Sequence, residues 1–298
     1  SDIYLIDDGV QRIVVKQALN RLKVRDLWRV DVARNLTEQQ FIRCISEFLP
    51  QATPRLVHHN NELNYFAMEY LEGYRNWKSI LLAGEAEPSL ARQAGKLLGT
   101  IHQHTRGDVA LLELFDTTRN FHALRTEPYL LTAASRHPAL RNQIVDEANR
   151  LDTTRLCLIH GDYSPKNIMV GPGRMVLLDC EVAWYGEPAF DLAFLFNHFL
   201  LKALFHRNPC FLSLTSTAWH EYQNCFGEPG PGLEARTGRL LLMLMLARID
   251  GKSPVEYLTD EQSKQAVRDF VYKMLPRQRF GLDEICSQWR QSIDNLTS

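Results

Sequence analysis

Residues 158–170 read LIHGDYSPKNIMV, where one apolar run leads into a polar loop and a second apolar run leaves it. The two apolar runs predict strands, and Pro165 predicts a turn between them. Asp162 and Asn167 lie on either side of this proline. Both side chains can therefore face one point above the strand ends, where carboxylate and amide oxygens suit a hard cation.

A second strand end carries two more carboxylates. Residues 176–181 read VLLDCE, so Asp179 and Glu181 follow a short apolar run. Side chains two positions apart on a strand project to the same side, so both carboxylates converge on one cation if the chain stays extended through Cys180. The alternative is that Glu181 turns away to cap a loop or to pair with an arginine.

The N-terminal part of the chain alternates short apolar runs with turn residues, which predicts strands. Asp7-Asp8-Gly9 is typical of a hairpin turn, and a helix is expected to begin near Thr37 as its N-cap. The expected strands are residues 3–6, 12–16, 55–59 and 63–71.

After Gly73 the pattern changes to helical spacing, interrupted by a compact group of short strands. The change predicts an α+β fold of two lobes: a small β-rich lobe over residues 1–73, with a hinge at 69–73, and a larger, mainly helical lobe over residues 74–298. A cleft between two lobes is a common place for a ligand. The expected strands of the second lobe are residues 155–159, 167–170 and 175–178, and its expected helices are residues 77–82, 89–104, 120–135, 140–151, 190–205, 212–226, 233–249, 261–274 and 282–292.

Composition excludes several classes of protein. The 34 Lys+Arg residues against 35 Asp+Glu give a net charge of −1, so no global field recruits nucleic acid or a membrane surface. The six cysteines form no C-x-x-C pair, which favours reduced thiols and a cytoplasmic location. The apolar stretch 189–205 contains Asp191 and other polar residues, so it predicts a buried core helix rather than a membrane span.

The spacing His160-x-Asp162-(x4)-Asn167, followed by Asp179 after an apolar run, matches the kinase catalytic-loop pattern. Over nearly its full length the chain resembles the aminoglycoside phosphotransferase/choline kinase superfamily, which comprises small-molecule relatives of the protein kinases. The Asp179-x-Glu181 pair is similar to that of methylthioribose kinases. The resemblance implies a bilobal protein-kinase-like fold and an ATP- and Mg²⁺-dependent phosphotransferase. Its acceptor would be a hydroxyl of a sugar, an amino alcohol or an aminoglycoside-like molecule.

The resemblance also implies roles for single residues around the reaction. Asp162 would orient and deprotonate the acceptor hydroxyl, while Asn167, Asp179 and Glu181 would bind Mg²⁺. Asp191 would brace the catalytic loop through backbone hydrogen bonds, and a helix N-cap is the compatible alternative for it. Lys166 either touches the γ-phosphate or is solvated.

Nucleotide binding is expected from the first lobe. The run Ile13-Val14-Val15-Lys16 resembles the kinase strand whose lysine pairs with the α- and β-phosphates. Glu38 is favoured over Glu47 as the carboxylate that holds Lys16. At the hinge, Glu69 and Leu71 would contact adenine through their main chains, with Met68 at the back of the pocket. The chain opens at Ser1, which resembles the trailing end of the family's phosphate loop, so an upstream strand and glycines are expected before it.

The acceptor is small, because the short stretch 180–190 leaves no room for the activation loop and peptide platform of a protein kinase. Candidate pocket residues are Tyr163, Trp184, Tyr185, residues 125–129 and His198. Each has a plain structural interpretation: core aromatic rings, a surface pair of Arg125 with Glu127, and a satisfied core histidine. The apolar run 240–248 is interpreted as core without an acceptor contact.

No acidic run marks the helical lobe, so a neutral or anionic alcohol is favoured over a polycationic antibiotic. The alternative function is a pseudokinase or a nucleotide-binding regulatory module. The presence of Lys16, Asp162, Asn167 and Asp179 argues against it.

Overall fold

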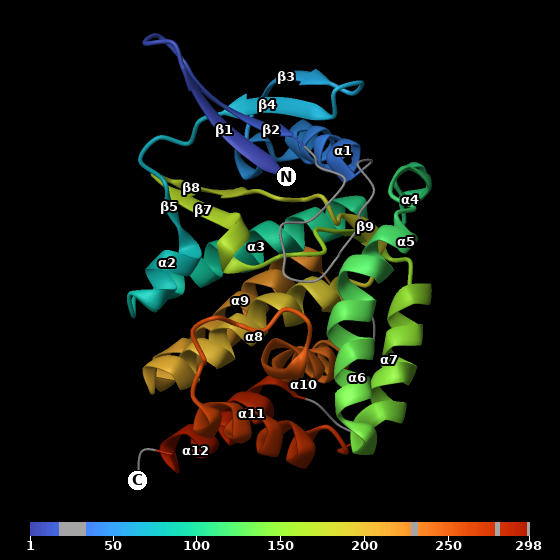
Figure 1. Ribbon diagram of the computed structural model, residues 1–298, viewed down its shortest axis with the longest axis vertical. Helices are drawn as coiled ribbons and strands as arrows, with labels where there is room; N and C mark the ends of the chain where they lie inside the picture. Colours follow the sequence, from blue (N-terminus) through green and yellow to red (C-terminus); the bar gives the residue numbers. More distant parts are fainter. Residues whose placement is uncertain (18–33, 228–231, 278–280, 297–298) are drawn as a thin grey trace.

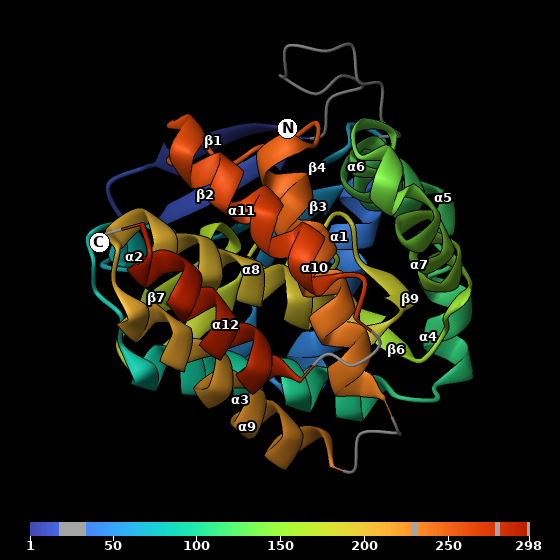
Figure 2. The ribbon, with the colours of Figure 1, turned by 90° about the horizontal axis from the view of Figure 1, so that it is seen from below.

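The computed structural model describes residues 1–17, 34–227, 232–277 and 281–296 (Figure 1). An antiparallel sheet and one helix form the smaller, N-terminal part, and helices dominate the larger part beneath it. The chain passes from one part to the other between Glu69 and Arg75, where the sequence predicts the hinge. Figure 2 shows α11 and α12 on the side of the helical part that lies far from the sheet.

The N-terminal sheet has the strand order β1-β2-β4-β3, with every neighbouring pair antiparallel. The predicted hairpin turn is confirmed, because Gly9 has a φ of +82° and its N–H donates to Asp7 Oδ1 at 2.9 Å. The prediction that Thr37 caps the helix is wrong: α1 already includes Arg34, so Thr37 lies within it. The bounds are β1 Asp2–Asp7, β2 Arg12–Gln17, α1 Arg34–Phe48, a 3₁₀ turn Pro50–Ala52, β3 Leu56–Asn60 and β4 Tyr65–Glu69.

A small apolar cluster joins this sheet to α1. Ile42 of α1 packs with Phe66 and Met68 of β4, and the partly buried Leu178 packs against them from the helical part. Leu178 immediately precedes Asp179 in the chain. The cluster therefore ties the position of Asp179 to the packing of the N-terminal sheet.

The helical part is built on α8 (Pro188–His206), whose residues are buried almost throughout. This helix is long and apolar enough to cross a membrane by length and composition, but 94% of its most apolar window is buried inside the protein. It is the central helix of the core, as its pattern predicts, and α10 (Leu233–Asp250) packs against it.

The other helices and strands surround α8. They are β5 Arg75–Asn76, α2 Trp77–Leu82, α3 Pro88–Thr105, α4 Val109–Leu114, α5 Thr118–Phe121, a π-helix His122–Leu131, α6 Thr132–Arg136, a 3₁₀ turn Pro138–Leu140, α7 Arg141–Thr153, β6 Cys157–Ile159, a 3₁₀ turn Pro165–Asn167, β7 Ile168–Gly171, β8 Arg174–Leu177, β9 Trp184–Gly186, a 3₁₀ turn Pro209–Leu212, α9 Ser213–Phe226, α11 Glu261–Met274 and α12 Leu282–Asp294.

Three features of this part differ from the sequence prediction. The short strands β5 and β9 were not expected; they pair with β7 and β6, so their partners lie far away in sequence. The short helix α4 was not expected either. The expected helix 120–135 is a run of three pieces, in which a π-helix containing Pro128 stands between α5 and α6. Proline cannot donate a backbone hydrogen bond, and π-helical segments are frequent at functional sites.

Candidate active site

The loop after β6 is held open by backbone hydrogen bonds to one buried carboxylate. His160 N–H donates to Asp191 Oδ2 at 2.7 Å, and Gly161 N–H donates to Asp191 Oδ1 at 2.9 Å. Gly161 has a φ of +74°, and a Cβ atom there would lie 2.4 Å from the Val182 carbonyl oxygen, so the position requires glycine. Asp191 thus lies where the resemblance implies, and Glu187, not Asp191, caps α8.

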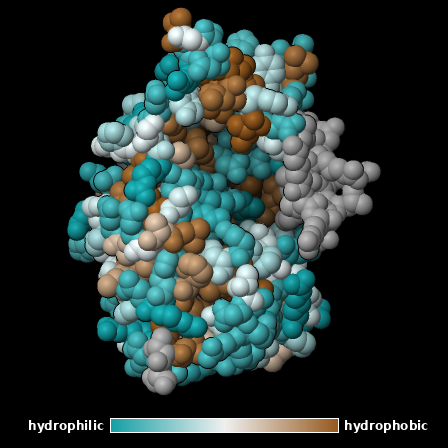
Figure 3. Space-filling model, turned by 60° about the vertical axis from the view of Figure 1, so that its left-hand side comes forward, coloured by the Kyte–Doolittle hydropathy of each residue, from teal (hydrophilic) through white to brown (hydrophobic). Residues whose placement is uncertain are grey.

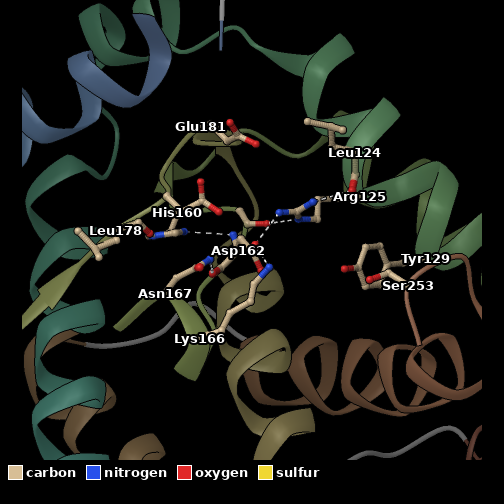
Figure 4. A network of polar contacts seen from close by, with 12 residues as sticks. Leu124, Arg125, Tyr129, His160, Asp162, Lys166, Asn167, Leu178, Glu181 and Ser253 are labelled. Atoms are coloured by element: carbon tan, nitrogen blue, oxygen red, sulfur yellow. Dashed lines mark hydrogen bonds and ion pairs between the residues drawn. The ribbon is translucent and has the colours of Figure 1, made fainter. Parts of the chain in front are cut away.

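Asp162 is buried, and its two carboxylate oxygens have different surroundings. Oδ2 lies 3.0 Å from Arg125 Nη2 and 2.9 Å from Lys166 Nζ. Oδ1 is buried and has no hydrogen-bond partner among the described residues. Burial alone would raise the pKa of Asp162, but the cations of Lys166 and Arg125 lower it below its ordinary value. Asp162 is therefore an ionised carboxylate with one oxygen fixed and one open (Figure 4).

Asn167 holds the far end of the same loop. Its side-chain Nδ2 donates to the Asp162 carbonyl at 3.0 Å, and its own carbonyl accepts from Leu178 N–H at 2.9 Å. These bonds connect the loop of Asp162 to the segment that carries Asp179. They leave the amide oxygen of Asn167 as the atom that could bind a cation.

Lys16 reaches across from β2 to two carboxylates. Its Nζ lies 2.7 Å from Glu38 Oε2 and 2.5 Å from Asp179 Oδ1. Glu47, the other candidate partner on α1, is exposed. Burial would lower the pKa of Lys16, but Glu38 and Asp179 raise it above its ordinary value, so the ammonium stays charged.

The pKa values of the two carboxylates beside Lys16 are shifted in opposite directions. Burial raises the pKa of Glu38 to about 7, although the charge of Lys16 partly offsets this effect. Burial would also raise the pKa of Asp179, but its contact with Lys16 lowers that pKa below the ordinary value. The negative charge at this point therefore resides first on Asp179.

Glu181 lies beside these carboxylates, but not through the predicted strand geometry. β8 ends at Leu177, and Asp179 has a φ of +61°, so the chain is not extended through Cys180 as the alternation argument requires. The left-handed Asp179 redirects the chain, and one oxygen each from Glu38, Asp179 and Glu181 lie within 4.8 Å of one another. Glu181 Oε1 also pairs with Arg34 Nη1 at 3.0 Å, the arginine contact named as the alternative.

We call Lys16, Arg34, Glu38, Asp179 and Glu181 the acidic cluster. Three carboxylates in close proximity repel one another, and two buried or partly buried cations relieve part of that repulsion. Together with the Asn167 amide oxygen, the carboxylates form the set of hard oxygen donors that Mg²⁺ prefers. The donor set therefore fits a divalent cation with phosphate oxygens as additional ligands.

The hinge residues lie in and just after β4. Met68 is buried in the cluster with Ile42 and Phe66, on the side that faces α1. The Glu69 carboxylate accepts from Arg174 Nη2 at 2.8 Å, and the Glu69 N–H donates to the Arg55 carbonyl at 3.0 Å. The Leu71 carbonyl accepts from Tyr74 N–H at 3.4 Å. The adenine contacts of Glu69 and Leu71 stay a prediction.

Three aromatic candidates for the acceptor pocket belong to the core, which the sequence indicates as the alternative to a pocket role. Tyr163 Oη donates to the Ala94 carbonyl at 2.8 Å, and Tyr185 Oη donates to the Thr105 carbonyl at 3.0 Å. Trp184 stacks on Phe121 with ring centroids 4.3 Å apart. These contacts direct all three side chains into the packing of the helical part.

The plain interpretation of Arg125 is wrong. Arg125 is buried and fixes Asp162, and its Nε donates to the Gly161 carbonyl at 2.5 Å. Glu127 pairs instead with Lys252. Arg125 and Tyr129 both lie in the π-helix, and the Arg125 guanidinium carbon lies 5.9 Å from the centroid of the Tyr129 ring.

One further expectation for this region fails. His198 is not a satisfied core histidine, because neither ring nitrogen has a hydrogen-bond partner among the described residues. The interpretation of the run 240–248 as core is confirmed, because Leu240 to Ala247 are buried. At the end of this run, Arg248 Nη1 lies 3.3 Å from Tyr129 Oη and 3.0 Å from Ser253 Oγ. An arginine in a long apolar run was the one signal in the sequence that could have identified this contact.

The family model for the phosphotransferase enzyme family matches residues 1–207, more than half of the chain. The chain belongs to the phosphotransferase enzyme family. The superfamily predicted from the catalytic-loop motif is thereby confirmed.

Relatives of known sequence and structure agree with this family. The chain is 28% identical over 222 residues to methylthioribose kinase of Pectobacterium carotovorum, covering 66% of this chain and 56% of that enzyme. It thus spans just over half the length of the curated relatives it matches. The fold is similar to an aminoglycoside phosphotransferase from Alicyclobacillus acidocaldarius, with a TM-score of 0.54 and 16% identity over 98% of this chain and 90% of that one.

A second solved structure shows the same fold. It is an amicoumacin kinase in complex with AMP-PNP and Ca²⁺, with a TM-score of 0.54 and 12% identity over 95% of this chain and 91% of that one. At these identities the likeness establishes the fold alone. The predicted bilobal kinase-like architecture is confirmed.

Proposed function

We propose that this protein transfers the γ-phosphate of ATP to a hydroxyl group of a small molecule. The observation that carries the proposal is that the two carboxylate oxygens of Asp162 have different surroundings. Oδ2 is fixed by Arg125 and Lys166, whereas the buried Oδ1 has no partner among the described residues. An acceptor hydroxyl can donate its hydrogen to this open oxygen. Membership in the phosphotransferase enzyme family supports the same reaction.

In the proposed reaction the acceptor oxygen forms a bond to the γ-phosphorus, and the bond from that phosphorus to the bridging oxygen of ADP breaks. The hydroxyl proton passes to Asp162 Oδ1. Because phosphoryl transfer has a loose transition state, positioning and charge stabilisation contribute most of the catalysis. Fixing Asp162 between two cations holds its open oxygen in one direction.

The acidic cluster would hold the nucleotide end of the reaction. Lys16 would pair with phosphate oxygens, held in place by Glu38. Asn167, Asp179 and Glu181 would bind Mg²⁺, which when bound neutralises the triphosphate charge. Met68, Glu69 and Leu71 would line the adenine pocket. A nucleotide analogue and a divalent cation in the amicoumacin kinase complex support this reading.

We also propose a cytoplasmic location. All six cysteines are free, which suits a reducing compartment.

The test is a screen of sugars, amino alcohols, hydroxy acids and aminoglycosides with the full-length protein, ATP and Mg²⁺. ADP release is followed by a coupled assay, and the product is identified by ³¹P NMR. We expect ADP and a phosphate monoester in equal amounts for at least one class of acceptor. Absence of turnover and of nucleotide binding across the panel would instead establish the pseudokinase alternative.

A further inference from the structure

The acceptor side of Asp162 holds more cations than carboxylates. Arg125 and Lys166 share the single carboxylate of Asp162. Two more cations, Arg248 and Lys202, form no ion pair among the described residues. We call Arg125, Lys166, Lys202 and Arg248 the cationic cluster, and Arg125 and Lys166 connect it to Asp162.

Tyr129 connects Arg248 to the catalytic loop. The guanidinium carbons of Arg125 and Arg248 lie 5.9 Å and 5.8 Å from the centroid of the Tyr129 ring, so a single side chain separates them. Burial would raise the pKa of the Tyr129 hydroxyl, but Arg248 and Arg125 lower it below its ordinary value. Figure 4 shows Tyr129 and Ser253 beyond Arg125 as seen from Asp162.

Arg248 is held by several hydrogen bonds but forms no ion pair within the described part of the chain. Its Nη1 donates to the carbonyl of Ser253 at 2.5 Å and lies close to two hydroxyl groups, while its buried Nε has no partner among the described residues. The chain around Ser253 is fixed in turn, because Val255 N–H donates to the Arg248 carbonyl at 2.8 Å. A buried guanidinium held only by neutral oxygens is costly unless an anion approaches it.

Two more buried polar side chains that have no hydrogen-bond partner among the described residues lie on α8. His198 and Lys202 are buried, and His198 Nδ1, His198 Nε2 and Lys202 Nζ have no hydrogen-bond partner in the described part of the chain. The Lys202 ammonium lies only over the Tyr257 ring, 4.8 Å from its centroid. The nearby Glu256 is already paired with Lys78. Within the described residues, the positive charge behind Arg248 therefore exceeds the negative charge beside it.

We propose that the acceptor carries an oxyanion, either a carboxylate or a phosphate monoester, and that Arg248 binds this group while Lys202 adds to the attraction. The inference rests on the proposed function and names the class of its acceptor. Arginine's planar fork suits both kinds of oxyanion. Tyr129 contacts both Arg248 and Arg125, the partner of Asp162, so the arrangement suits a small molecule that carries its charged group and its reacting hydroxyl at different positions.

The surface is hollowed between the two parts of the molecule. Figure 3 shows a hollow between the N-terminal part and the helical part on the face that it presents. An anionic acceptor would also be drawn toward a site whose far side is positive, whereas an amino alcohol or an aminoglycoside would be repelled by the same charges.

The test uses four probes with one three-carbon skeleton: glycerol, glycerate, glycerol 3-phosphate and 3-amino-1,2-propanediol. Each is titrated into the full-length protein by calorimetry, with and without Mg²⁺ and AMP-PNP. We expect glycerate or glycerol 3-phosphate to bind at least about tenfold more tightly than glycerol, and the amine to bind most weakly. The preferred anion distinguishes a carboxylate acceptor from a phosphorylated one.

Variants assign the binding to Arg248. Arg248→Gln is expected to weaken binding of the preferred anion by about tenfold or more, and Arg92→Gln, at an exposed arginine of α3 paired with Glu221, to leave it unchanged. If Arg248→Gln does not fold, Lys202→Met provides the same test, with an expected loss of about threefold or more.

Equal binding of glycerol and the anions, no binding of either anion, or an unchanged affinity in the folded variant would overturn the inference. Mg·AMP-PNP binding, measured separately, tests the proposed function. A protein that binds the nucleotide and phosphorylates only neutral or cationic alcohols contradicts the anionic acceptor alone.

Discussion

Two charged clusters near Asp162 differ in the sign of their excess charge. In the acidic cluster, Lys16 contacts two carboxylates and Arg34 contacts a third, so each of these buried cations has a partner. In the cationic cluster, two cations share Asp162, and Arg248 and Lys202 form no ion pair in the described residues. The acidic cluster thus has three carboxylates against two cations, whereas the cationic cluster has more cations than carboxylates among the described residues.

This difference shows what each half can bind. A group of carboxylates and a lysine can accept a metal ion and phosphate oxygens by exchanging partners within the cluster. An excess of buried positive charge suits a ligand that carries negative charge. The difference therefore supports the proposed placement of the nucleotide at the acidic cluster and of the acceptor at the cationic cluster.

The largest effect is expected where the two halves meet. Asp162→Asn keeps the shape of the side chain but removes the open anionic oxygen, so turnover should fall by about 10²–10⁴-fold. Steady-state ADP release measures the loss, with Asp269→Asn, at an exposed aspartate of α11, as the matched control. Turnover within a factor of two of the unaltered protein would remove Asp162 from the reaction.

Arg125 should act by positioning Asp162. Arg125→Gln leaves the carboxylate with Lys166 alone, so kcat should fall by about 10²-fold through misplacement of the open oxygen, with the nucleotide affinity unchanged. Arg125→Lys should recover part of kcat, because it restores the charge. Arg119→Gln, at an exposed position of the same helical run, is the control. Equal losses in Arg125→Gln and Arg125→Lys, together with a lower urea midpoint in both, would indicate a structural role only.

A variant of Glu181 tests whether the acidic cluster binds Mg²⁺. Glu181→Gln removes one of three neighbouring carboxylates, so the Mg²⁺ concentration needed for half-maximal turnover should rise about tenfold, while ATP affinity at saturating Mg²⁺ changes less. Glu47→Gln on the exposed side of α1 is the control. If Glu181→Gln responds to Mg²⁺ like the unaltered protein, Glu181 serves only as the partner of Arg34.

The free energy of unfolding of a Lys202 variant tests whether the positive charge of the cationic cluster is unpaired. Burial lowers the pKa of Lys202 to about 7 from an ordinary value of 10.5, so the unfolded chain binds more protons between these two values. The penalty of burying Lys202 is thus complete below about pH 7 and fades as the pH rises toward 10.5. Lys202→Met should raise the free energy of unfolding at pH 7 by about 1–3 kcal/mol.

Urea midpoints at pH 7 and pH 9.5 measure this effect, with Lys96→Met at an exposed position of α3 as the control. The advantage of Lys202→Met over the unaltered protein should shrink at the higher pH. A destabilised Lys202→Met at both values would show that Lys202 has a stabilising partner in solution.

The sequence predicts the acidic half better than the cationic half, for a physical reason. Asp162, Asn167 and Asp179 lie close together in the chain, in the loops and turns beside three short strands, so their sequence spacing predicts that they meet. The π-helix, α8 and α10 bring Arg125, Lys202 and Arg248 together from distant positions, and no local pattern encodes that meeting.

The same reason explains the errors within the fold. The two-residue strand β5 and the strand β9 exist only through partners that lie far away in sequence. Apolar periodicity predicted one helix over 120–135 but could not show that Pro128 lies in a π-helical segment. Likewise, the left-handed Asp179, rather than strand alternation, brings Asp179 and Glu181 near one another.

The division of the site is tested most directly by Mg²⁺-dependent ATP binding in two variants, measured side by side by calorimetry. Asp162→Asn alters the acceptor end, so it should bind Mg·ATP nearly as tightly as the unaltered protein. Asp179→Asn removes a carboxylate from the acidic cluster, so its Mg·ATP affinity should fall by about tenfold or more. Equal losses of nucleotide affinity in the two variants would contradict the proposal that the acidic cluster binds the nucleotide and Asp162 serves the acceptor.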